Sequence, residues 1–259
     1  MKTLKVGAAC LTDYETFEDV TADLPRFIDE VFNTPIPSRE ISGAHRCYPA
    51  TLSARGENTM SAKLFKTDIL FLQRMLAVSG FYKGPLNGKW SSDVDAAEEN
   101  FLTRYEEIKG QAGELDNRTE ACIMSLIPAA QIKAREFMNA VKGRPLTYRI
   151  ISGTRTYAEQ DALFAKRPRV TKARGGQSNH NFGIAWDVGI FENGKYYEGN
   201  TKKEDKAYVE LGAFIKANVA GLEWGGDWKS FVDKPHYQLA TGKSVAQVRA
   251  LLEKGKSYV

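Results

Sequence analysis

Two histidines and two aspartates in the second half of the sequence have the residue types of a metal-dependent hydrolytic site. His180 and Asp187 lie in the segment Ser-Asn-His-Asn-Phe-Gly-Ile-Ala-Trp-Asp, and Asp233 and His236 lie in Asp-Lys-Pro-His. Two histidines and one carboxylate form a known ligand set for catalytic zinc, with the fourth position left for water. The second carboxylate, three residues from a histidine, could accept a proton from that water. From spacing alone, ordinary hydrogen-bonded or surface side chains remain the alternative.

A strand expected over residues 184–191 positions one of the carboxylates. Alternation with a period of two places the large apolar side chains on one face: Trp186, Val188 and Ile190. Asp187 then lies on the other face, between Ala185 and Gly189. A carboxylate between two small residues packs poorly in a core, so the pattern indicates a carboxylate that points into a cleft.

The other two features of the pattern are a second strand and a close turn. A short strand is expected to begin at His236, which places His236 and Gln238 on one face and Tyr237 on the opposite face. His180 precedes the first strand in a loop, where Gly183 permits a close approach of the backbone.

From about residue 115 onward, expected helices and strands segregate along the chain, which favours an α+β fold over a doubly wound one. Helical patterns cover residues 120–141, 157–164, 207–218 and 245–253, and a further strand is expected over 146–151. Asp116 or Asn117 is a candidate cap for the first of these helices, and Pro128 is expected to split or kink it. A basic, glycine-containing loop covers 166–177.

Residues 65–112 predict a small helical module in which Asp68 caps the first of two helices. A turn-rich loop, Gly-Phe-Tyr-Lys-Gly-Pro-Leu-Asn-Gly-Lys-Trp, joins the helices. The module resembles the peptidoglycan-binding domain of many cell-wall hydrolases at these residues: Leu72, Gln73, Leu76, Gly80, Phe81, Tyr82, Gly84, Gly88, Trp90, Ala97 and Phe101. The alternative is a generic helix pair whose aromatic side chains fill their own core.

Residues 1–64 form a separate N-terminal segment whose role the sequence does not indicate. It contains a helical pattern at 17–32, interrupted by Pro25, and a loop-like stretch at 33–61. The apolar run at 6–11 is cut short by polar residues, so no signal peptide is expected.

Composition excludes several classes of protein. With 42% hydrophobic and 26% charged residues, the 259-residue chain is not collagen-like, low-complexity or wholly disordered. Its net charge of +4 comes without a basic stripe, so nucleic acid is not an expected partner. No stretch reaches the roughly 18 apolar residues of a membrane span. The three cysteines are far apart and form neither a disulfide framework nor a zinc knuckle.

Three segments, in this order, resemble one family of peptidases. They are Ser-Gly-Thr-Arg-Thr-Tyr-Ala-Glu-Gln at 152–160, the histidine segment at 178–187, and Trp-Gly-Gly-Asp-Trp followed by Asp-Lys-Pro-His at 224–236. Together they resemble the VanY-like zinc D-alanyl-D-alanine carboxypeptidases and L-alanyl-D-glutamate endopeptidases, from residue 119 to the end of the sequence. The tryptophan-glycine turn is most similar to the endopeptidase branch, which is common among phage endolysins.

The resemblance implies an α+β peptidase domain over 113–259, with a small antiparallel sheet flanked by helices. It also implies one zinc ion bound by His180, Asp187 and His236, with Asp233 as general base and acid.

The resemblance also assigns residues around the metal. Arg155 would hold the scissile carbonyl or a substrate carboxylate and stabilise the oxyanion, since guanidinium groups suit bidentate recognition. The alternative for Arg155 is a structural pair with a carboxylate. Candidate substrate-binding residues are Ser178, Gln160, Trp224 and Trp228. The alternatives are that Ser178 and Gln160 position a metal ligand and that the two tryptophans pack in the core. Thr154 departs from the tyrosine or phenylalanine that the family commonly has, which affects the packing of the pocket and leaves the ligands intact.

The sequence therefore predicts a modular peptidoglycan hydrolase that cuts the L-alanyl–D-glutamate bond of the stem peptide. The alternatives are a D-alanyl-D-alanine carboxypeptidase with the same metal site, and a non-catalytic, zinc-containing wall-binding protein. We expect a monomer that is made in the cytoplasm and acts on the cell wall. It would reach the wall after holin-type lysis, as an endolysin does, or by delivery as an effector.

Overall fold

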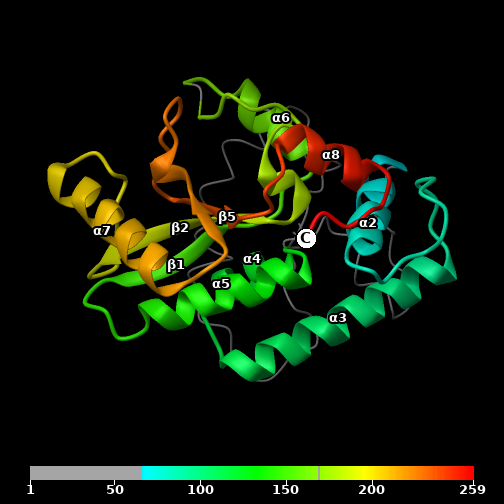
Figure 1. The fold of residues 1–259 in the computed structure, drawn as a ribbon, viewed down its shortest axis with the longest axis horizontal. Coiled ribbons are helices and arrows are strands. Elements are labelled where there is room, and N and C mark those ends of the chain that lie inside the picture. Colours follow the sequence, from blue (N-terminus) through cyan, green and yellow to red (C-terminus); the bar gives the residue numbers. More distant parts are fainter. Residues whose placement is uncertain (1–65, 169) are drawn as a thin grey trace, which may run out of the picture. The chain divides into compact units, whose positions relative to one another are not determined.

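The sheet that carries the candidate ligands is antiparallel and joins strands that are distant in the sequence (Figure 1). The computed structural model describes residues 66–168 and 170–259. The strands follow the order β1 (Thr147–Ser152), β2 (Ala185–Glu192), β5 (His236–Leu239) and β4 (Leu222–Trp224), and β3 (Lys195–Tyr196) pairs with the end of β2. The expected α+β class with a small antiparallel sheet is confirmed.

One face of the sheet is apolar and packs on a helix layer. The three large residues of β2, Trp186, Val188 and Ile190, are fully buried, as the alternation predicts. Tyr237 of β5 is also fully buried, and its ring lies 4.8 Å from that of Phe137 on α5 (Pro128–Val141). The opposite face of β2 and β5 is therefore free to carry polar side chains.

The helices of the described residues are, in chain order, α2 (Lys66–Val78), α3 (Ser92–Ala112), α4 (Asn117–Met124), α5 (Pro128–Val141), α6 (Tyr157–Ala165), α7 (Lys202–Asn218) and α8 (Val245–Glu253). Of these, α4, α5 and α7 pack against strands of the sheet. Two short 3₁₀ turns, η2 (Asn179–Phe182) and η3 (Gly225–Asp227), precede β2 and follow β4. In the described part of the chain, no helix combines the length and the apolar character that crossing a membrane requires.

Local chemistry explains where the helices begin. Asp116 accepts a hydrogen bond from the backbone of Thr119 and so caps α4, one of the two caps that the sequence allowed. Pro128 begins α5 as its first residue, where its missing N–H costs nothing, so the predicted helix is split into two. The expectation that Asp68 caps α2 is wrong, because α2 begins at Lys66 and Asp68 lies within its first turn.

Two short strands, β3 and β4, were not predicted from the sequence, and α7 begins earlier than predicted. β3 and β4 contain two and three residues, which is too short for a pattern of alternation to be recognised. α7 begins at Lys202 rather than at residue 207, because Thr201 caps it by accepting a hydrogen bond from Glu204. The first turn of α7 is polar, so apolar spacing did not indicate it.

The helical module, residues 66–112, uses its sequence motif to build its own interior. Its side chains at Leu72, Leu76, Ala97 and Phe101 are buried. Gln73 is fully buried and holds the connecting loop, since its Oε1 accepts hydrogen bonds from the backbone of Asn87 and Gly88. The predicted helix–loop–helix order is thus present, and its motif residues have structural roles.

The module also packs against the remainder of the described chain, and residues from 66 onward form one compact unit. Gly183 adopts a φ of 67°, and a Cβ there would lie 2.4 Å from the Cε of Met75 on α2. The Gly183 carbonyl also accepts a hydrogen bond from Ile127 at the start of α5. The division at 112/113 stays a prediction, and the patterns expected over 1–64 lie outside the described residues.

A buried ion pair fixes α3, α4 and α5 to one another. Arg135 is 2% exposed, and two of its guanidinium nitrogens bind the Glu120 carboxylate at 3.0 and 2.6 Å. The Tyr105 hydroxyl donates to the same carboxylate at 2.7 Å. Burial opposes the charge of Glu120, but the hydrogen bonds from Arg135 and Tyr105 outweigh it and lower the pKa of the carboxyl.

Replacing Glu120 with glutamine should destabilise the fold by about 3–5 kcal/mol at neutral pH, because it leaves a buried arginine without its counter-charge. A carboxyl whose pKa is lowered on folding stabilises the protein above its unfolded pKa, and this contribution disappears as the pH falls through the folded value. The difference between wild type and Glu120→Gln should therefore shrink below about pH 4. Urea unfolding at neutral and acid pH measures it.

The matched control is Glu107→Gln, which removes an exposed glutamate paired with Arg104 on α3. It should change the free energy of unfolding little at either pH. A loss in Glu120→Gln no larger than in this control would contradict the role given to the buried pair.

Candidate metal centre

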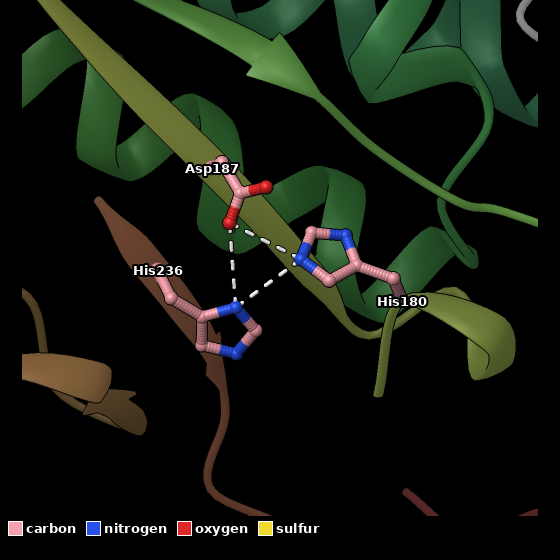
Figure 2. Close-up of side chains that lie close together, drawn as sticks. All are labelled: His180, Asp187 and His236. Atoms are coloured by element: carbon pink, nitrogen blue, oxygen red, sulfur yellow. Dashed lines mark hydrogen bonds and ion pairs between the residues drawn. The ribbon is translucent and has the colours of Figure 1, made fainter. Parts of the chain in front are cut away.

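Three side chains from two strands and one 3₁₀ turn converge on one point (Figure 2). Asp187 Oδ1 lies 3.1 Å from His180 Nε2 and 3.4 Å from His236 Nδ1. The two imidazole nitrogens lie 3.2 Å apart. Each residue offers one ligand atom, so the group could hold a metal ion.

The pairing of β2 with β5 positions two of these side chains, and a 3₁₀ turn positions the third. Asp187 and His236 are direct partners in the antiparallel pairing of β2 with β5, so they share a face of the sheet. His180 lies on η2, which Ser178 caps and Gly183 ends in a left-handed conformation. The glycine turn at Gly183 was expected from the sequence, whereas the pairing that brings Asp187 beside His236 is seen only in the structure.

The outer nitrogens of both imidazoles are held by acceptors. His180 Nδ1 lies 2.7 Å from the carbonyl oxygen of Gly153, and His236 Nε2 lies 3.0 Å from Oε1 of Gln238. In its neutral form each ring then carries its proton on the outer nitrogen, which leaves an unprotonated nitrogen facing inward. Two lone pairs and a carboxylate oxygen then face one another, and a cation between them is the arrangement that satisfies all three.

Electrostatics within the cluster follow from burial and from these contacts. Burial lowers the pKa of His180, against the opposing effect of Asp187. Burial opposes the charge of Asp187 too, but the two imidazoles outweigh it and hold the pKa of its carboxyl well below the usual value. For His236, burial is outweighed by the hydrogen bond and the charge of Asp187, which raise its pKa. The carboxylate thus stays ionised, as a metal ligand must.

Asp233 lies in the loop that leads into β5, beside these residues. Its backbone N–H donates to the carbonyl of Gly225 at 3.0 Å, and its own carbonyl accepts from the backbone of His236 at 3.3 Å. Burial and the negative charge of Asp187 raise the pKa of its carboxyl. A raised pKa makes the carboxylate a stronger proton acceptor.

Arg155 is part of the same network. Its Nη2 binds Asp187 Oδ2 at 2.8 Å, and its other contacts are with Ser152 Oγ and with Oε1 of Gln160. These contacts match the structural pairing that the sequence left as an alternative for this arginine. They also direct the other carboxylate oxygen, Asp187 Oδ1, toward the two histidines.

The four candidate substrate-binding residues have different surroundings. Ser178 caps η2 through the backbone of His180, and the fully buried Gln160 holds Arg155. Trp224 is buried, and its indole N–H donates to the backbone of Lys234 at 2.7 Å. Trp228 is half-buried, and its ring lies 4.8 Å from that of His236. Its side chain therefore lies directly beside a candidate metal ligand.

Several site residues were not predicted from the sequence. Gly153 and Gly225 lie inside the motifs at 152–160 and 224–236, but a backbone carbonyl acceptor has no signal in side-chain types. Gln238 was placed on the face of His236 by alternation, and nothing in that pattern indicated the hydrogen bond between them.

Gly225 packs closely against the backbone and side chains of the segment that leads into β5. A Cβ at this residue would lie 2.4 Å from the carbonyl oxygen of Asp233 and 3.0 Å from the Cβ of His236. Any larger side chain must therefore displace the backbone that positions both residues.

Comparison with known proteins identifies relatives over this part of the chain. The family described as D-alanyl-D-alanine carboxypeptidase matches residues 171–239. The peptidoglycan L-alanyl-D-glutamate endopeptidase CwlK of Bacillus subtilis (strain 168) is 34% identical over 127 residues, which cover 44% of this chain and 73% of that protein.

Two more distant similarities concern the same region. The L-alanyl-D-glutamate peptidase of Listeria phage A118 is 29% identical over 122 residues, which cover 47% of this chain and 41% of that protein. The crystal structure of the Serratia marcescens L-Ala D-Glu endopeptidase ChiX is similar over 47% of this chain and 86% of its own, with 24% identity and a TM-score of 0.38.

The substitution Gly225→Ala should weaken the binding of Zn²⁺ by about tenfold or more, because it displaces the backbone beside His236. The control is Gly110→Ala on α3, where a Cβ meets nothing within 4 Å and no positive φ is needed. Competition with a chromogenic chelator measures both affinities. Equal affinities in the two variants would show that Gly225 does not position the ligand.

Proposed function

This chain belongs to the VanY-like family of metallopeptidases, which includes D-alanyl-D-alanine carboxypeptidases and L-alanyl-D-glutamate endopeptidases, and we propose that it cuts the L-alanyl–D-glutamate bond of peptidoglycan stem peptides. The single observation that carries this proposal is the convergence of His180, Asp187 and His236 beside the carboxylate of Asp233. The choice of bond rests on the similarity to CwlK and to the phage peptidase.

We propose that the resident ion is zinc, held by His180 Nε2, Asp187 Oδ1 and His236 Nδ1. Zinc favours imidazole and carboxylate ligands, and three protein ligands with one open position are typical of its catalytic sites. Zinc bound there would polarise the scissile carbonyl and bring the pKa of water to about 7.

Asp233 is proposed to accept the proton of the attacking water and to pass it to the leaving amine. Its burial and raised pKa support this role, because both increase the basicity of the carboxylate. The backbone contacts with Gly225 and His236 hold it beside the ligands.

Arg155 is proposed to act in two ways. Its bond to Asp187 Oδ2 orients the ligand carboxylate, and the second N–H of Nη1 remains available for an oxygen of the substrate. The half-buried ring of Trp228 would line the same cleft. Gln160 supports Arg155 rather than contacting the substrate in this arrangement.

The remaining parts of the proposal concern the whole protein. Residues 65–112 would bind the cell wall, as their resemblance to peptidoglycan-binding domains suggests. The protein would work as a monomer on the wall, after release by lysis or delivery as an effector. The matched region spans 41% of the length of the phage relative.

A D-alanyl-D-alanine carboxypeptidase is the second candidate, because the matching family carries that description. Both reactions use the same metal site, and they differ only in which peptide bond enters it. The products therefore distinguish them.

Purified peptidoglycan incubated with the protein should release stem peptides with a new D-glutamate amino terminus, and a chelator should abolish the release. Mass spectrometry of the products identifies the bond. Loss of a single D-alanine would replace the proposal with the carboxypeptidase. If the zinc-loaded protein releases no peptide, the proposed activity is wrong.

The variant Asp233→Asn should lower the rate of cleavage by about 10²–10⁴-fold, because an amide cannot accept the proton. Its affinity for zinc should stay within about threefold of wild type, since Asp233 is not a proposed ligand. The control is Asp227→Asn, which removes an exposed carboxylate on η3 that pairs with Lys216 of α7. Undiminished cleavage by Asp233→Asn would remove Asp233 from the mechanism.

A further inference from the structure

Three amide and carboxylate side chains form a row behind His236: Gln238 on β5, Glu223 on β4 and Asn179 on η2. Gln238 follows His236 on the same face of β5 and is 7% exposed. Gln238 pairs across the sheet with Glu223 of β4 and with Ala185 of β2. Because Ala185 is small, the amide of Gln238 has room to lie beside the imidazole.

Each polar atom of the Gln238 amide has a defined partner. Its Nε2 donates to Glu223 Oε2 at 2.7 Å. Its Oε1 lies 3.0 Å from His236 Nε2 and also accepts from Asn179 Nδ2 at 2.8 Å. Asn179 belongs to η2, the turn that carries His180, so the same oxygen joins the segments of both histidines.

The direction of these hydrogen bonds follows from one charged group. An ionised carboxylate can only accept hydrogen bonds, so Glu223 must face the NH₂ group of Gln238. The carbonyl oxygen of the amide then faces His236 and can only accept. His236 must therefore carry its proton on Nε2, which leaves the Nδ1 lone pair directed at Asp187 and His180 (Figure 2).

The geometry points to Gln238, held by Glu223 and Asn179, as the positioning residue that fixes the tautomer and ring orientation of His236 for metal binding. This inference rests on the proposed role of His236 as a ligand. Gln238 itself touches neither a metal nor a substrate. It acts through the imidazole, as hydrogen-bond partners behind metal-ligating histidines commonly do.

The exposed end of the row provides a test that leaves the core unchanged. In Glu223→Lys, the ammonium group can only donate, so it favours the reverse orientation of the Gln238 amide. The reversed amide presents NH₂ to His236 and moves the imidazole proton to Nδ1, the atom that should bind the metal. Glu99→Lys, at an exposed position on α3, is the matched control for the change of charge.

Two further variants test Gln238 directly. Gln238→Leu keeps the approximate size of the side chain and removes the acceptor. The exchange Gln238→Glu with Glu223→Gln restores it, because a carboxylate at 238 accepts from His236 and from the amide at 223. The hydrogen bond from His236 Nε2 to residue 238 then has the same donor and acceptor as in wild type.

Chelator competition with Zn²⁺ gives the first readout. Gln238→Leu and Glu223→Lys should bind zinc about 10–100-fold more weakly than wild type. The exchange variant should recover most of that loss, and Glu99→Lys should stay within about threefold of wild type. If Gln238→Leu and Glu223→Lys both bind zinc as tightly as the control, the inference is overturned.

Nitrogen-15 NMR of histidine-labelled, metal-free protein gives the second readout, at a pH where the imidazoles are neutral. The chain has three histidines, so the spectrum is simple to assign. Wild type should show His236 as the Nε2–H tautomer, and Glu223→Lys should shift it toward Nδ1–H. An unchanged tautomer in a folded Glu223→Lys protein would contradict the inference. This readout needs no bound metal or activity, so it separates failure of the positioning role from failure of the proposed function.

Discussion

The candidate metal centre depends on two imidazole nitrogens and one carboxylate oxygen that lie 3.1–3.4 Å from one another and face the same point. Such atoms repel one another unless a positive charge lies between them. The protein keeps them in place by fixing the opposite edge of each group: Gly153 holds His180, Gln238 holds His236, and Arg155 holds Asp187. The backbone and side chains that hold these three groups must therefore stay rigid.

That rigidity comes from residues outside the centre. The pairing of β2 with β5 places Asp187 opposite His236, and the buried aromatic face beneath them packs on α5. The turn that carries His180 lies against the helical module, where Gly183 leaves space for Met75. The module therefore supports the catalytic half of the molecule through direct packing, whether or not it also binds the wall.

The sequence predicted most of the centre because its chemistry is carried by side-chain types at readable spacing. Alternation placed Asp187 on the face opposite the large apolar side chains of its strand, and it placed His236 and Gln238 together on one face of theirs, but the pairing of these two strands was not predicted. Contacts made by backbone carbonyls, such as that of Gly153, left no such signal, and β3 and β4 were too short to show a period. Arg155 was predicted at the site with a structural carboxylate pair as the alternative, but no local pattern indicated that its partner would be Asp187, 32 residues further along the chain.

The most direct test of the central claim is X-ray absorption spectroscopy of the zinc-loaded protein at the zinc edge. We expect one zinc per chain with nitrogen and oxygen neighbours at about 2.0–2.2 Å, including the multiple scattering of two imidazoles. Replacing His180 and His236 with alanine should remove that signal. A zinc ion with sulfur neighbours, or one whose spectrum is unchanged in the double variant, would contradict the account.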